Sequence, residues 1–320
     1  MKDYVCLNKN YSTTRRLIQR CPDAIVKRAT LPKTEEAEFG TTLFAREGEG
    51  RQGEGGLRSK GFFKKNVEKT VLVTVITVVF NDVKHIEETI NSVINQTYDN
   101  VEYLVIDGGS TDGTLDVLGK YDDQIDYWVS ECDKGIYDAM NKGIELATGV
   151  WLNFMNSGDK YFSSDVLMQI FGVWNFGNVE IIYGNNEVRY PYKTRLVSAG
   201  NIDNLWKGSQ FSHQSAFIRS DLHKESKYNI SNSIASDSEF FYQCYVKGRL
   251  FRCLDKTIAT VSSGGLSDTN RIDSIVGFWK LQEKKPSINI YYIWMILKEM
   301  VKDRLGKIPI LKNQLLTHQK

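Results

Sequence analysis

Two hydrophobic patterns alternate along the middle of the chain. The run VLVTVITVVF at Val71–Phe80 is β-branched and continuously apolar, which predicts a strand covered on both faces. After a break at Asn81, the apolar residues of DVKHIEETINSVINQ recur at helical spacing and predict a helix. The unit repeats as a strand at Val101–Ile106 and a short helix, for which Asp112 is the expected N-cap.

The alternation continues as far as Met155. Strands are predicted at Ile125–Ser130 and Val150–Met155, with a helix between them over Gly135–Ala147. Repeated strand and helix units predict an α/β fold, in which a mostly parallel sheet is flanked by helices. Ligands of such a sheet bind beyond the carboxyl ends of its strands.

The second half of the chain is less regular and is expected to be α+β. A helix is predicted near Ser236–Lys247. Strands are predicted near Glu180–Tyr183, Ser215–Ile218, Leu250–Leu254 and Ile258–Val261.

The two ends differ from the domain that we assign to residues 70–271. Residues 1–69 include REGEGRQGEGGLRSKG, which is too rich in glycine and charge to bury a core, so we expect a flexible, disordered low-complexity tail. A partner-binding segment is the alternative. Residues 272–320 are predicted to form a helical appendage, because INIYYIWMILKEMVKDRL mixes bulky aromatic residues with lysine and arginine. Such a helix either lies on a membrane surface or packs on the domain.

Charge is distributed unevenly. Residues 1–69 carry 15 Lys/Arg against 9 Asp/Glu, a net of +6. Residues 70–271 carry 17 against 26, a net of −9, and residues 272–320 carry 9 against 4, a net of +5. The acidic middle argues against a nucleic-acid partner. The basic ends fit either an anionic membrane surface or plain exposure to solvent.

Cysteine usage and hydropathy bear on location. The five cysteines are odd in number and contain no C-x-x-C pair, which disfavours a zinc site or a disulfide framework and fits a reducing cytosol. The residues after Met1 lack a secretory pattern, and no apolar run reaches the roughly 18 residues that a spanning helix needs. A cytoplasmic protein is expected.

Two polar segments directly follow predicted strands. DGGSTDGT begins at Asp107, where the glycines permit a close backbone approach and the carboxylates stand at a strand's carboxyl end. NSGD at 156–159 follows the strand that ends at Met155. Both could be ordinary turns. As a site, oxygen-bearing side chains from neighbouring strand ends suit Mg²⁺ or Mn²⁺ bridging to substrate phosphates. The spacing of a dinucleotide-binding fingerprint is missing, which counts against a nucleotide-cofactor oxidoreductase.

Six segments together resemble the inverting family 2 glycosyltransferases of the GT-A fold, over roughly residues 71–265. They are VTVITVVFND, SVINQTYDNVEYLVIDGGSTDGT, DKGIYDAMNKGIELATG, FMNSGD, HQSAFIR and ASDSEFF. More narrowly, the chain resembles bacterial enzymes of surface-polysaccharide and lipopolysaccharide assembly. The resemblance implies transfer of a sugar from a nucleoside diphosphate to a glycan or polyprenyl-linked acceptor, at the inner face of the plasma membrane. A catalytically weak nucleotide-sugar or glycan-binding module is the alternative.

The resemblance also implies donor-binding roles for individual residues. The nucleobase and ribose would be held by Thr77, Val79, Asn81, Asp107 and Ser110. Further donor contacts would come from Lys134, Tyr137, Asn141 and Asn156.

Metal and base candidates follow from the same resemblance. NSGD stands where the family carries D-x-D, so Asp159 is the remaining carboxylate ligand for Mg²⁺ or Mn²⁺. The family's E-D-like pair corresponds to Ser236-Asp237, which makes Asp237 the candidate base, with Glu239 as the nearby alternative; helix capping is the other role open to Asp237. His213 and Gln214 resemble a position that faces the acceptor or the phosphates.

Overall fold

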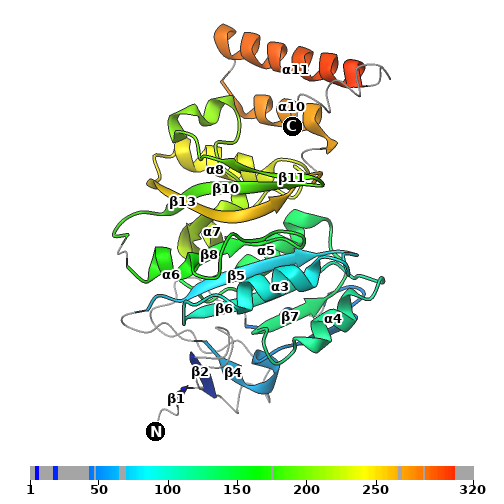
Figure 1. Cartoon of the computed structure of the whole chain (residues 1–320), viewed down its shortest axis with the longest axis vertical. Coiled ribbons are helices and arrows are strands. Elements are labelled where there is room, and N and C mark those ends of the chain that lie inside the picture. The colour runs from blue at the N-terminus through cyan, green and yellow to red at the C-terminus, as the bar shows by residue number, and fades with distance from the viewer. Residues whose placement is uncertain are drawn as a thin grey trace.

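The computed structural model describes residues 4–6, 17–20, 43–46, 48–64, 70–173, 176–265, 269–283 and 285–306. Its main feature is one large sheet, with helices packed on both faces (Figure 1). The central strands run in the order β7 (Tyr127–Ser130), β6 (Val101–Asp107), β5 (Val73–Val79) and β8 (Trp151–Phe154), and all three pairings between them are parallel. The predicted α/β class and parallel centre are therefore confirmed.

The register of these strands gathers the predicted polar segments at one edge of the sheet. Val79 at the end of β5 pairs with Asp107, and Asp107 pairs with Ser130 at the end of β7. On the other side of β5, Ile76 pairs with Phe154, so the Asn156–Asp159 segment emerges at the same edge. Parallel strands place their carboxyl ends together, which is why segments distant in sequence meet here.

Each face of the sheet has its own hydrophobic core. Because neighbouring residues of a strand point to opposite faces, Val75 of β5 packs into one core and Ile76 into the other. The first core is completed by α3 (Ile86–Ile94), α4 (Thr114–Lys120) and α6 (Val166–Phe171). The second is completed by α5 (Ile136–Leu146), α7 (Ser220–Glu225) and α8 (Ser236–Val246).

The sheet continues past β8 with mixed directions. The added strands are β12 (Ala216–Arg219), β10 (Ile181–Tyr190), β13 (Phe251–Ser262), β9 (Lys160–Tyr161) and β11 (Lys193–Val197). The two strands predicted near 250–254 and 258–261 are one strand, β13, which stays continuous through register shifts opposite Gly184 and Asn185. The polar hairpin strand β11 is a feature that the prediction lacked.

Part of the predicted tail belongs to the sheet. β3 (Gly53–Gly55) pairs antiparallel with β7. The short helix η1 (Arg58–Lys60) follows, and the buried Arg58 side chain forms a 2.6 Å ion pair with the buried Glu102 of β6. Residues 48–64 therefore correct the expectation of a tail reaching residue 69. Arg58 holds this glycine-rich stretch in place, because the Glu102 carboxylate with which it pairs is buried inside the domain.

The remaining N-terminal elements form a separate small sheet. β1 (Tyr4–Cys6) pairs antiparallel with β2 (Leu17–Arg20), which also pairs with β4 (Phe62–Phe63). The rest of the expected tail lies outside the described residues.

In the described part of the chain, two long helices lie beyond the sheet. α10 (Arg271–Leu281) contacts α8, and α11 (Pro286–Gly306) packs on α10 at one end of the molecule (Figure 1). The short helix η2 (Ile202–Lys207) anchors α11, because the Tyr292 hydroxyl donates to the Trp206 carbonyl at 2.6 Å. Within the described residues, no helix is long and apolar enough to cross a membrane.

Candidate active site

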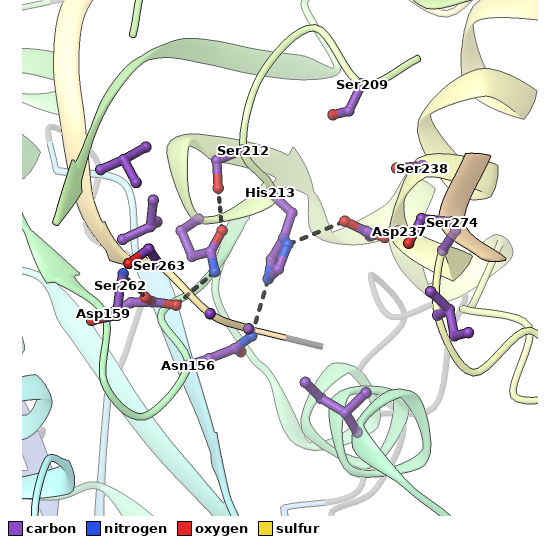
Figure 2. A pocket seen from close by; sticks show the side chains of 18 of the residues that line it. Asn156, Asp159, Ser209, Ser212, His213, Asp237, Ser238, Ser262, Ser263 and Ser274 are labelled. Carbon is purple, nitrogen blue, oxygen red and sulfur yellow. Dashed lines mark hydrogen bonds and ion pairs between the residues drawn. The ribbon is translucent and has the colours of Figure 1, made fainter. Parts of the chain in front are cut away.

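A cavity of about 850 Å³ lies beyond the carboxyl ends of β5 and β8. The central sheet, the loop before β12 and the helices α5, α8, α10 and α11 all contribute to its wall. Five of the residues predicted for the site line it: Tyr137, Asn156, Asp159, His213 and Gln214, together with the candidate base Asp237. Figure 2 shows several of them pointing toward one another.

Asp237 lies in the first turn of α8 and faces this cavity. One carboxylate oxygen accepts from the Tyr137 hydroxyl at 2.9 Å, and the other lies 3.2 Å from Nδ1 of His213. Burial acts to raise the pKa of Asp237, but the hydrogen bonds from His213 and Tyr137 outweigh it and hold the pKa below its usual value. With 20% of its side chain exposed, the carboxylate is ionised, oriented and open to a ligand.

Asn156 fixes the state of the His213 ring (Figure 2). The Asn156 amide nitrogen lies 3.1 Å from Nε2 of His213, and because an amide N–H can only donate, Nε2 accepts. Nδ1 then carries the hydrogen that it donates to Asp237. The other amide atom of Asn156, Oδ1, is buried with no hydrogen-bond partner among the described residues. This oxygen is therefore a candidate ligand only if the Asn156 side chain turns toward the cavity that it lines.

Asp159 is held by protein groups on both of its oxygens. It accepts from the side-chain amide of Gln214 at 2.6 Å and from the backbone N–H of Ser262 at 2.9 Å. Burial raises the pKa of this carboxyl. Asp159 thus joins the loop after β8 to the segment before β12 and to the end of β13, which closes one side of the cavity.

The DGGS loop lies next to the cavity and is tied together by its own aspartate. Asp107 is fully buried and accepts from the backbone N–H groups of Gly109 and Ser110 and from the hydroxyl of Ser130. The Ser110 hydroxyl in turn accepts from the backbone N–H of Asn81 at 2.7 Å. Asp107 and Ser110 therefore shape the loop, and neither is among the residues that line the cavity.

The other predicted donor residues also lie outside the cavity lining. Thr77 is buried inside the sheet and donates to the Met155 carbonyl, and Val79 is buried beside Asp107. Asn141 exchanges two hydrogen bonds with the Tyr228 backbone. Lys134 is exposed at the start of α5. Contact of these residues with a donor stays a prediction.

Sequence reasoning missed several residues of the cavity. Asp82 accepts from the Ser157 hydroxyl at 2.6 Å and lines the cavity, and its place directly after a strand was an available signal. Lys207, Arg271 and Tyr292 had no such signal, because they reach the cavity only through the packing of η2, α10 and α11.

Comparison with known proteins places this chain in a family. The model of glycosyl transferase family 2 matches residues 74–237. An uncharacterized glycosyltransferase of Mycobacterium tuberculosis is 36% identical over 182 residues, which cover 52% of this chain and 66% of that protein. The PGL/p-HBAD biosynthesis glycosyltransferase of Mycobacterium bovis is 30% identical over 187 residues, covering 56% of this chain and 73% of that protein.

A solved structure shares the fold. It is the mannosyltransferase PcManGT from Pyrobaculum calidifontis in complex with GDP-Man and Mn²⁺, with a TM-score of 0.54. The match covers 80% of this chain and 81% of that one at 17% identity, so the likeness concerns the fold alone. The expected GT-A architecture is confirmed.

Proposed function

Because the chain belongs to glycosyl transferase family 2, we propose that it transfers a sugar, with inversion, from a nucleoside diphosphate to a glycan or polyprenyl-linked acceptor. The observation that carries the proposal is the Asp237 carboxylate, which faces the 850 Å³ cavity and is oriented by two side chains. The biological setting that we propose is surface-polysaccharide assembly, lipopolysaccharide included, at the inner face of a bacterial plasma membrane.

In the proposed reaction, Asp237 accepts the proton of the acceptor hydroxyl. The hydroxyl oxygen attacks the anomeric carbon from the face opposite the diphosphate, the bond to the diphosphate oxygen breaks, and the nucleoside diphosphate leaves. No covalent sugar–enzyme bond is needed for inversion. His213 and Tyr137 act as positioning residues, because each holds one oxygen of the base.

A divalent cation, Mg²⁺ or Mn²⁺, is part of the proposal, since the solved mannosyltransferase is in complex with GDP-Man and Mn²⁺. Asp159 and Asn156 are the residues that would hold such a cation through oxygen atoms; Asp159 would exchange a hydrogen bond from Gln214 or Ser262 for it, and the buried Oδ1 of Asn156 would turn toward it. In the described part of the chain, no group of three or more His, Cys, Asp or Glu could hold a metal ion. The donor phosphates would therefore supply further ligands, and the bound cation would neutralise charge on the leaving diphosphate.

The donor site that we propose lies at the ends of β5, β6 and β8. Asn81 and Lys134 are the exposed candidates for direct contact with the nucleotide. Asp107, Ser110 and Thr77 would act by holding the loop and the strand end in place, because their polar atoms already bind protein groups. Val79 and Asn141 belong to the same supporting layer.

The test is release of nucleoside diphosphate and sugar transfer by the purified protein, over a panel of nucleotide sugars with Mn²⁺. General-base catalysis contributes about 10²–10⁴-fold, so Asp237→Asn should lower the rate by that factor while leaving the donor-induced rise in melting temperature. Glu239→Gln is the matched control, since Glu239 lies in the same helix but contacts Asn229 and Asn232.

Two results would count against the proposal. Full activity in Asp237→Asn would remove this residue as the base. Donor binding with no turnover in the wild type under every condition would favour the alternative function, a nucleotide-sugar-binding module, to which the missing D-x-D sequence points.

A further inference from the structure

The helix α11 is apolar on two opposite faces. Its inner face carries Tyr292, which is buried, and Met295, and both line the cavity. Its outer face carries six exposed apolar side chains between positions 290 and 301: Ile290, Ile293, Trp294, Leu297, Met300 and Val301. At 3.6 residues per turn these six fall within about one third of the helix circumference, opposite Tyr292.

The outer face is a continuous stripe rather than scattered exposure. Ile290, Trp294 and Leu297 are 67%, 54% and 55% exposed, and their spacing of three and four residues makes them neighbours on the helix surface. Single exposed apolar residues need no explanation, whereas a contiguous apolar surface marks a place of interaction. Figure 1 shows α11 at the edge of the molecule, with α10 between it and the sheet.

Basic side chains near this apolar stripe indicate which kind of surface it would bind. Lys298 lies exposed next to Trp294, with its ammonium group 5.0 Å from the ring centroid, and Arg304 is exposed one turn after Met300 on the same side of the helix. Lys302 is turned away from the stripe and pairs with Glu299 at 2.8 Å. Residues 272–320 carry nine Lys/Arg against four Asp/Glu. An aromatic and aliphatic stripe bordered by basic side chains is complementary to an anionic lipid surface, where the apolar groups enter the interface and the cations meet the headgroups.

We propose that α11 docks the protein on an anionic membrane through this outer face, and that its inner face forms the acceptor end of the cavity. Arg271, Phe278 and Tyr292 line that end, and Lys207 lines the cavity beside α11, so it offers cations and aromatic surface to an amphipathic phosphate-linked acceptor. A helix is about 10 Å across, which places the cavity within reach of the headgroup of a lipid-linked sugar. The docking stands on α11 alone, and the choice of acceptor rests on the proposed function.

The rigidity of α11 makes both faces act together. The Trp279 ring stacks on Tyr292, and the Trp279 N–H donates to Asn289 at 2.9 Å, which joins α10 to α11. The Tyr291 hydroxyl donates to the Lys207 carbonyl, and Lys207 itself lines the cavity. These contacts hold α11 against α10 and η2, so a surface docked on its outer face would lie at a defined orientation to the cavity wall.

Cosedimentation with phosphatidylcholine vesicles, with and without phosphatidylglycerol, tests the docking. The wild type should bind the anionic vesicles, and more weakly as salt is added. Ile293→Asp/Leu297→Asp should lower vesicle affinity at least tenfold, because two exposed aliphatic groups that would enter the lipid interface are replaced by charges that the headgroups repel. Lys298→Gln and Arg304→Gln should each lower it roughly fivefold. Val173→Asp, at a position that is 79% exposed in a different part of the molecule, is the matched control and should bind as the wild type does.

Two outcomes would overturn the proposal. One is vesicle binding by Ile293→Asp/Leu297→Asp at wild-type strength. The other is a wild type that does not bind vesicles but is a dimer by light scattering, while the same double variant is a monomer. The stripe would then be an interface with a second copy of the chain. Release of nucleoside diphosphate without vesicles is measured in parallel and should be unchanged in the double variant. If neither the wild type nor any variant releases nucleoside diphosphate while the wild type still binds vesicles, the proposed function is refuted and the docking proposal stands.

Discussion

Replacement of Arg58 by methionine should destabilise the whole domain. The guanidinium is 2% exposed and the Glu102 carboxylate 1% exposed, at a separation of 2.6 Å. Arg58 also donates to the carbonyls of Leu43 and Leu146 at 2.9 and 3.0 Å. Methionine fills much of the same volume but supplies none of these donors.

The magnitude follows from what the change leaves behind. Removal of one partner of a buried ion pair costs about 3–5 kcal/mol, because the remaining charge is uncompensated. Glu102 still accepts hydrogen bonds from Thr74 and Thr148, and the Lys224 ammonium still attracts its charge, but among the described residues it keeps no direct ion pair after the replacement. Domains are stable by roughly 5–15 kcal/mol, so Arg58→Met should remove a large fraction of the free energy of unfolding.

Urea denaturation followed by circular dichroism measures the effect. Lys60→Met is the matched control from the same short helix: its ammonium group pairs with Asp122 and Asp123 at the surface, where a pair contributes about 0–1 kcal/mol. Arg58→Met/Glu102→Gln should recover at least about 1 kcal/mol, since it removes the unpaired charge. If Arg58→Met costs no more than Lys60→Met, residues 48–64 are not an integral part of the domain and our reading of that segment is wrong.

Two titratable side chains give further predictions. Burial raises the pKa of Asp126 to about 7, so between about pH 4 and pH 7 the unfolded chain is ionised there while the folded protein keeps the proton, and stability falls as the pH rises through this window. In Asp126→Asn this contribution is absent, so the free energy of unfolding of the variant relative to wild type should grow by on the order of 4 kcal/mol from pH 4 to pH 7. Chemical denaturation at several pH values measures it. If the idea is wrong, the plots of unfolding free energy against pH will be parallel for the two proteins. Tyr137→Phe removes one hydrogen bond that lowers the pKa of Asp237, so the acidic limb of the kcat/KM profile should move to higher pH; an unmoved limb would show that the rate does not depend on this carboxylate.

The sequence predicted the elements whose signal is local. The strand β5 and the helix α5 were found within two residues of their bounds, because a continuous apolar run and a helical period need no tertiary information. Asp112, in contrast, is not the N-cap of α4: Gly113 holds that position, and Asp112 accepts from the backbone N–H of Thr114. One residue of error is typical of helix ends.

The site was predictable only in part, for the same reason. Strand ends gave Asn156 and Asp159, and the resemblance gave His213 and Asp237, which the structure brings to one cavity. The sequence could not show that the Asp107 carboxylate already accepts hydrogen bonds from protein groups, because one of its donors is Ser130 of the neighbouring strand. It also could not show that α10 and α11 complete the wall, since α11 is positioned by contacts with η2 and α10 by packing on α8.

β3 also has a consequence for handling the protein. Its three residues cover the outer edge of β7, which would otherwise present unpaired N–H and C=O groups to other chains. A protein shortened to the family-matched region, from residue 74 onward, would uncover that edge beside the apolar β7 side chains. Such a fragment should associate edge to edge and precipitate, so expression trials and crystallisation designs ought to retain residues 48–64.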